Sequence, residues 1–149
     1  MRTRIALSVG VVAALVLGLA APANAASNES FLARLSGANE LPAGTGDPDA
    51  VGVGLFRIKA GSGRICYVIH VRNVDGTVNG AHLHAGKADQ EGAVVAALEP
   101  PVHMGSVAAC KWIGKTLAAA IRKSPRKYYL NIHSTAFADG ALRGQLRRA

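Results

Sequence analysis

Aromatic residues, cysteines and long apolar segments are all scarce in this sequence of 149 residues. Phe, Trp and Tyr make up only 5% of the chain and do not alternate with the basic residues, so the stacking groove of a single-strand nucleic-acid binder is not expected. The two cysteines form no Cys-x-x-Cys pair, which excludes a zinc ribbon. After residue 21 no apolar run is long enough to span a bilayer.

The motifs of common catalytic sites are absent as well. The chain contains no Gly-x-Ser-x-Gly elbow, no Gly-x-Gly-x-x-Gly turn and no Walker motif. His133 precedes Ser134 and Thr135, but the pattern offers no carboxylate to orient it as a triad requires. The sequence therefore indicates no reaction and favours a non-enzymatic role. Several acidic residues fall in predicted loops, where carboxylates are usually solvated: Glu40, Asp47, Asp49, Asp89, Glu91 and Asp139.

The N-terminal segment has the order of a secretory signal peptide. Arg2 and Arg4 form the positive region, residues 5–21 form the uncharged apolar region, and residues 23–25 form a small-x-small cleavage site. We predict a leader over 1–25, a single domain over 26–149 that is secreted or otherwise extracytoplasmic, and no transmembrane segment after cleavage. The alternative is an uncleaved anchor, because the apolar run is nearly long enough to span a bilayer.

Positive charge dominates the predicted domain. The chain carries 17 Lys and Arg against 9 Asp and Glu, a formal charge of +8, and loss of Arg2 and Arg4 with the leader lowers this to +6. We expect a general attraction to acidic wall polymers or lipid surfaces, and no specific binding of nucleic acid. The expected partners are an anionic cell-envelope polymer or an unidentified extracellular protein.

Cys66 and Cys110 both lie in the predicted domain. An even number of cysteines in an exported domain favours a disulfide. Closing a loop of this length removes denatured-state entropy worth about 4 kcal/mol. Two buried free thiols, or a pair of metal ligands, are the alternatives.

Short segments of alternating apolar and polar residues predict a mainly β domain, an antiparallel sandwich or barrel with one short helix. The clearest element is a hairpin of 51–59 and 64–72, joined by a Gly-rich connection. Apolar residues at helical spacing predict the helix over 112–123, which Ser124 and Pro125 end. Further strands are predicted at 31–35, 79–86, 93–98, 127–134 and 141–147, with a loop over 41–49.

The most specific local pattern is His82-Leu83-His84. Residues two apart in a strand share a face, so both imidazoles project together while Leu83 enters the core. By the same alternation His133 points outward, and it joins the pair if the two strands are neighbours. Three neutral imidazoles suit zinc or copper, whereas a Cu(I) or blue-copper site would need a thiolate or Met nearby. The alternative is that these histidines only form hydrogen bonds at the surface.

The other two histidines are weaker candidates for a metal site. His70 shares a strand face with Cys66 and is expected to be a packed, hydrogen-bonded side chain. His103 lies in a Pro-rich loop and is expected to be solvated.

Four segments combine into a specific pattern. They are 33–42, which ends in Asn-Glu-Leu-Pro; 80–86 with His-x-His; 128–134 with Tyr-x-Asn-x-His; and 140–146 with Arg-Gly-Gln-Leu. Together they resemble the CHRD domain, the module named from chordin and also found alone in exported bacterial proteins. Residues 138–141, Ala-Asp-Gly-Ala, depart from the more typical Pro-x-Gly of the family, which should alter a turn and not the fold.

The resemblance implies an extracellular β domain without an established reaction, and a role in interaction more than in catalysis. The shared residues fit a scaffold with a polar cluster on the histidine side. Within that cluster Arg143 is expected to pair with Glu40 in a structural role. The polar cluster comprises Glu40, Asn131, Arg143 and Gln145.

Two hypotheses for the function follow. The first is a secreted, disulfide-closed module that binds a partner or has a structural role outside the cell. The second is a copper- or zinc-binding protein that uses His82, His84 and His133, with redox chemistry loosely like that of copper–zinc superoxide dismutases, by analogy of fold alone.

Overall fold

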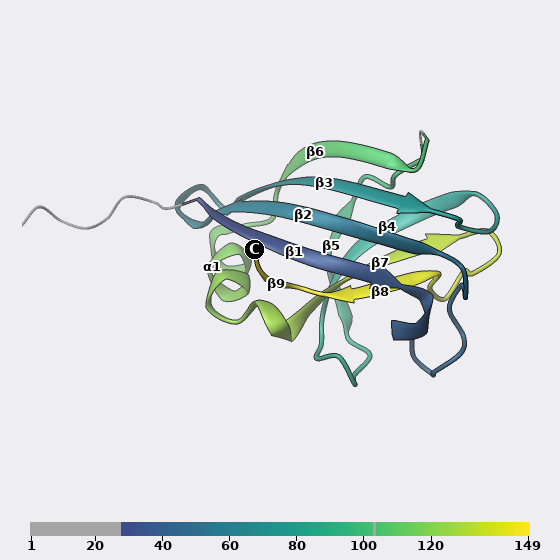
Figure 1. The fold of residues 1–149 in the computed structure, drawn as a ribbon. Helices are drawn as coiled ribbons and strands as arrows, with labels where there is room; N and C mark the ends of the chain where they lie inside the picture. Colours follow the sequence, from purple (N-terminus) through teal and green to yellow (C-terminus); the bar gives the residue numbers. More distant parts are fainter. Residues whose placement is uncertain (1–27, 103) are drawn as a thin grey trace, which may run out of the picture.

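The computed structural model describes residues 28–102 and 104–149 (Figure 1). The predicted leader, its cleavage site and His103 lie outside the described residues. The strands are β1 (Glu29–Ser36), β2 (Val51–Lys59), β3 (Arg64–Arg72), β4 (Val78–Ala85), β5 (Ala93–Leu98), β6 (Ser106–Trp112), β7 (Tyr128–Ser134), β8 (Leu142–Gln145) and β9 (Arg147–Arg148). The helical elements are α1 (Lys115–Lys123) and the 3-10 turns η1 (Gly37–Asn39), η2 (Ala60–Ser62) and η3 (Pro125–Lys127).

The strands form one antiparallel sheet that curls into a nearly closed barrel (Figure 1). Their order is β5-β4-β7-β8-β1-β2-β3-β6, and β9 adds to β1. A side chain links the two edge strands: Lys111 Nζ on β6 donates to the Ala97 carbonyl on β5 at 2.8 Å. Beside it the Tyr67 hydroxyl of β3 accepts from the Glu99 N–H, just after β5. The prediction of a mainly β sandwich or barrel with one short helix is confirmed.

The core lies inside the curled sheet because every long strand alternates between an inward and an outward face. Leu83 of β4 and Leu130 of β7 are fully buried, as are Ile58 and Ile65 of the hairpin. Helix α1 contributes its own buried Ile121. Each such side chain stabilises the fold by about 1.5–3 kcal/mol relative to exposure.

The predicted hairpin is confirmed, since β2 and β3 pair without a break from Val51–Arg72 to Lys59–Arg64. The predicted start of the helix at Trp112 is wrong. Residues 106–112 form strand β6, which pairs with β3, and α1 begins only at Lys115. Gly114 separates the two elements with φ +87, a conformation that glycine adopts far more readily than other residues. The predicted end of the helix is confirmed, since α1 ends at Lys123.

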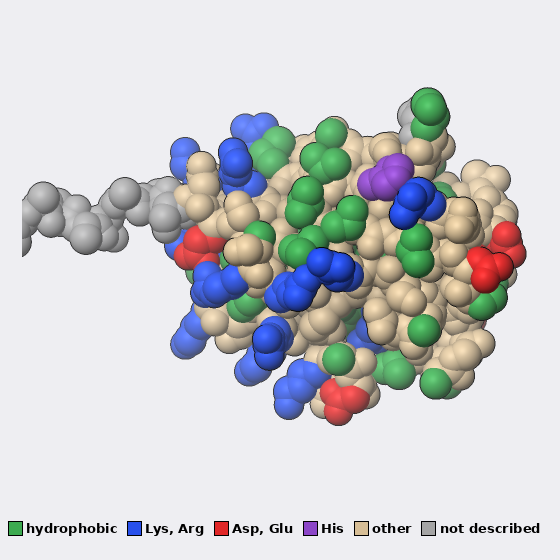
Figure 2. Space-filling view, viewed as in Figure 1, with side chains coloured by type: hydrophobic (Ala, Val, Ile, Leu, Met, Phe, Trp, Pro, Cys, Tyr) green, Lys and Arg blue, Asp and Glu red, His purple; other side chains and the backbone are tan. Residues whose placement is uncertain are grey.

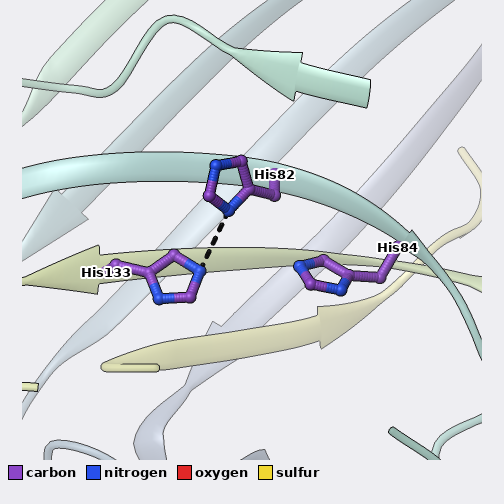
Figure 3. A group of neighbouring side chains, drawn as sticks. All are labelled: His82, His84 and His133. Carbon is purple, nitrogen blue, oxygen red and sulfur yellow. Dashed lines mark hydrogen bonds between the residues drawn. The ribbon is translucent and has the colours of Figure 1, made fainter. Parts of the chain in front are cut away.

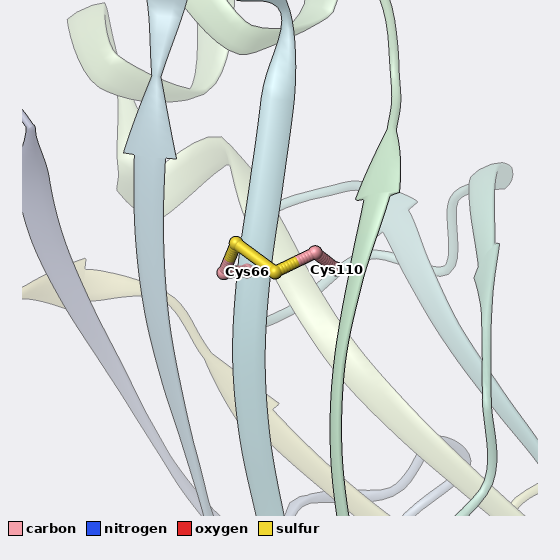
Figure 4. The surroundings of a disulfide bond; sticks show 2 residues. All are labelled: Cys66 and Cys110. Carbon is pink, nitrogen blue, oxygen red and sulfur yellow. A yellow bond between two sulfur atoms is a disulfide. The ribbon is translucent and has the colours of Figure 1, made fainter.

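The disulfide between Cys66 and Cys110 is confirmed (Figure 4). The two residues stand directly opposite each other in β3 and β6, with their Cα atoms 3.9 Å apart. The bond therefore fastens an edge strand to the rest of the sheet, and the described residues include no free cysteine. No helix in 28–102 or 104–149 has both the length and the apolar character needed to cross a membrane.

Candidate metal centre

A polar face lies on the outside of β4, β7 and β8, opposite the core. In the strand register His82 faces Asn131, His84 faces Tyr129, and Asn131 also faces Arg143 on its other side. The intervening Leu83, Leu130 and Leu142 point inward and are fully buried. The side chains of the polar face are His82, His84, Tyr129, Asn131, His133, Arg143 and Gln145.

Three histidines come together on this face (Figure 3). His82 and His84 project from β4, and His133 projects from β7, which is its neighbour in the sheet. Each ring offers one nitrogen, and these three nitrogens all lie within 4.8 Å of one another. The closest two are His82 Nδ1 and His133 Nε2, at 3.1 Å.

Backbone carbonyls hold two of these rings in place. His84 Nδ1 lies 2.8 Å from the Gly92 oxygen, and His133 Nδ1 lies 2.9 Å from the Ala138 oxygen. A carbonyl only accepts, so each Nδ1 carries the hydrogen and each Nε2 keeps its lone pair. His84 Nε2 is buried and has no hydrogen-bond partner among the described residues.

The surroundings favour neutral imidazoles. Burial lowers the pKa of His82, and the neighbouring His133 and His84 lower it further. Burial also lowers the pKa of His84, against a smaller opposing effect of its hydrogen bond to Gly92. Both shifts favour the neutral ring, which is the form that binds a metal ion.

Tyr129 and Arg143 form a stack beside His84. The Tyr129 ring stacks on His84, with centroids 4.7 Å apart and planes 12° apart, and the Arg143 guanidinium lies 3.6 Å from the Tyr129 centroid. Arg143 Nη2 donates to the carbonyls of Lys87 and Gln90, which fastens the β4–β5 loop over the polar face.

The predicted ion pair between Arg143 and Glu40 is wrong. The described residues contain ion pairs only at Glu29, and the Arg143 guanidinium instead donates to loop carbonyls. Gln145 has a similar role, because its Nε2 lies 2.7 Å from the carbonyl oxygens of both Gly86 and Arg126.

Glu40 lies on the loop after β1, where it meets the polar face. Its side chain is 4% exposed, and Asn131 Nδ2 donates to Glu40 Oε2 at 3.3 Å. Burial raises the pKa of Glu40 to about 7, although the positive charge of Arg143 opposes the rise. Glu40, Asn131, Arg143 and His84 all line one cavity of about 370 Å³.

Two acidic residues that were expected to be solvated are buried instead. Glu40 is buried against the polar face, and Asp47 is only 1% exposed. Asp47 accepts the backbone N–H of Asp75 at 2.8 Å and that of Asp49 at 3.3 Å, so it ties the β1–β2 loop to the turn after β3. His70 lies away from the three histidines, half-buried on β3, with Nδ1 2.7 Å from Ser106 Oγ.

The Glu40 carboxyl makes the stability of the fold depend on pH. Its pKa of about 7 in the folded chain lies above the ordinary 4.5, so the native state holds this proton more tightly than the unfolded chain. The resulting stabilisation is complete below pH 4.5 and is lost as the pH rises through 7. We expect Glu40→Gln to be more stable than the wild type by about 3 kcal/mol at about pH 8 and by less than about 1 kcal/mol at about pH 5.

Urea unfolding of both proteins at the two pH values measures this difference. If the difference in free energy of unfolding between variant and wild type were the same at both pH values, the pKa of Glu40 would not be raised by folding. Asp89→Asn is the matched control, because Asp89 is an exposed loop carboxylate.

Comparison with protein families matches residues 31–146, most of the chain, to the CHRD domain. Searches of curated proteins and of solved structures each found no match to the chain. The matched span runs from β1 to the residue before β9 and so includes the three histidines and Glu40. Membership supports a binding or structural module in general terms, and the disulfide fits a place outside the cytoplasm. The chain belongs to the CHRD domain family.

Proposed function

We propose that His82, His84 and His133 bind one divalent transition-metal ion, zinc or copper. The observation that carries this proposal is the orientation of the rings: two Nδ1 atoms are fixed by backbone carbonyls, which leaves both Nε2 lone pairs facing the third histidine. Metal-binding histidines usually donate their second nitrogen in this way, because it sets the tautomer and the direction of the ligand nitrogen.

The spacing of the nitrogens fits a single ion. Two nitrogens bound to one tetrahedral zinc at about 2.0–2.1 Å lie about 3.3 Å apart. His82 Nδ1 and His133 Nε2, at 3.1 Å, already have nearly this separation. The largest separation in the group is up to 4.8 Å, so binding draws the rings closer together.

The ligand set determines which ions are suitable. The cluster consists of imidazoles alone among the described residues, which suits Zn²⁺ or Cu²⁺ and not the thiolate-containing blue-copper sites. Three protein ligands leave a coordination position for water or another ligand, as in catalytic zinc sites. A bound ion would supply Lewis-acid chemistry in the case of zinc, or electron transfer in the case of copper.

We also infer that the metal-binding domain works outside the cytoplasm as a binding or structural module. The Cys66–Cys110 disulfide and the signal-like segment 1–25 support this inference. N-terminal sequencing of the secreted protein tests it, with Ala26 as the expected first residue.

Metal analysis tests the proposed site directly. Protein purified without a tag, incubated with Zn²⁺ or Cu²⁺ and dialysed, is expected to retain about one ion per chain. His82→Ala, His84→Ala and His133→Ala should each weaken binding by more than about 100-fold, because each removes a ligand and not only an outer hydrogen bond.

His70→Ala is the matched control, since this half-buried histidine lies outside the cluster, and it should bind the metal as the wild type does. Metal content near zero in the wild type, or equal in all four variants, would overturn the proposal. In that case the 3.1 Å contact of His82 and His133 is only a hydrogen bond.

A further inference from the structure

The other half of the sheet presents a broad outward face that nothing described here covers. We call it the docking face: the outward side chains of β1, β2, β3 and β6. Registers Leu32↔Leu55, Leu55↔Val68 and Val68↔Ala108 place these four residues in a row across the strands. At these outward positions there is no Asp or Glu, since Glu29 of β1 shares the inward alternation of Phe31.

The centre of the docking face is apolar and exposed. Leu55 and Val68 stand directly opposite each other and are 49% and 48% exposed. Trp112, at the β6 edge, is 71% exposed. Figure 2 shows hydrophobic side chains gathered over the middle of β1–β3, with acidic side chains only towards the edges of the view. Neighbouring apolar side chains left open in this way mark an interaction site.

Cations surround this apolar centre. Arg34, Arg57, Lys59, Arg64 and Arg72 are all exposed outward residues of β1–β3. None of the five takes part in the ion pairs of the described residues, both of which involve Glu29.

Two of these cations are close enough to repel each other. Lys59 and Arg64 face each other directly in the register, and like charges opposite each other destabilise a sheet. An anionic partner on the docking face would relieve this repulsion. The same charge disfavours a second copy of the chain as the occupant, because two such faces would repel.

We propose that the docking face binds an anionic lipid surface. The sheet offers a broad face, its cations meet lipid phosphates, and its apolar centre enters the headgroup region, where the amphipathic Trp112 ring is also favoured. A soluble polyanion would use the cations but leave the apolar centre unexplained. The metal centre lies on β4 and β7, away from these strands, so this inference stands whether or not a metal is bound.

Vesicle co-sedimentation tests the proposal. The purified protein is expected to bind vesicles that contain phosphatidylglycerol and not vesicles of phosphatidylcholine alone, with binding that weakens as salt is added. Leu55→Asn with Val68→Asn keeps every charge and should weaken binding at least about tenfold. Arg57→Glu with Arg64→Glu should weaken it more, since each lost cation alone accounts for about fivefold.

The control is Lys87→Glu with Lys127→Glu, an equal change of charge at two exposed residues outside the docking face, which should alter binding by less than about threefold. Thermal unfolding checks that all variants fold. Equal binding to both kinds of vesicle would overturn the proposal. So would unchanged binding of the Leu55/Val68 variant, particularly if soluble polyphosphate competes fully, since the face would then be a general polyanion site.

Discussion

Loss of the Cys66–Cys110 disulfide is expected to lower the free energy of unfolding by about 4 kcal/mol. The bond closes a loop with a sequence separation of 44, and it joins two residues that face each other in β3 and β6. Without it the denatured chain regains the entropy of that loop. Strand β6 then keeps only its backbone pairing to β3 and a few side-chain contacts, such as that of Lys111 with Ala97.

Urea unfolding with and without a reducing agent measures this loss. The variant Cys66→Ala with Cys110→Ala is the control, because it should match the reduced wild type and show no response to the reductant. Hydrogen exchange should show that the amides of β6 lose protection before those of β2. A loss below about 1 kcal/mol would mean that the β3–β6 pairing also restrains the unfolded chain.

Leu83→Ala is expected to cost about 3 kcal/mol of stability, more than any single substitution of the three histidines. Leu83 is fully buried between the outward-facing His82 and His84, so its loss leaves a cavity directly beneath the pair. His84→Ala removes a buried nitrogen that has no hydrogen-bond partner, which offsets part of the packing that is lost.

Thermal and urea unfolding of Leu83→Ala, Leu83→Met and His84→Ala, all without metal, measure this order. Leu83→Met nearly conserves the volume and should cost less than about 1.5 kcal/mol. If His84→Ala lowered the stability most, His84 would have a structural role in the polar face. Its unpartnered Nε2 does not suggest such a role.

The strands were predictable where the apolar residues alternate strongly. Arg64–Arg72 carries a large apolar side chain at every inward position, and Val51–Lys59 does so in its second half, at Phe56 and Ile58, so the period of two is clear. Both strands match their predicted bounds. Strand β6 was missed because its sequence SVAACKW offers small residues on both faces. The helical spacing that follows therefore predicts a helix from Trp112, and only the pairing with β3 identifies the strand.

The histidine pair was predictable from alternation alone, whereas the third ring depended on which strands are neighbours. The sequence also placed Asn131, Arg143 and Gln145 on the same side. It did not reveal that two loops cover this face, because the carbonyls that receive Arg143 belong to residues about 55 positions away. For the same reason the sequence predicts Glu40 and Asp47 as solvated acids, whereas both are buried. The Asn-Glu-Leu-Pro segment of the family pattern was the available signal for Glu40.

The tautomer of one proposed metal ligand depends on a residue with no side chain. Gly92 offers its carbonyl to His84 and its N–H to the Tyr129 hydroxyl, and a Cβ placed on it would lie 1.7 Å from the Ala85 oxygen. Any larger residue at 92 must push the loop outward, and both hydrogen bonds move with it. A relative that retained all three histidines but not this glycine would thus have the three ligands without the hydrogen bond that orients the His84 ring.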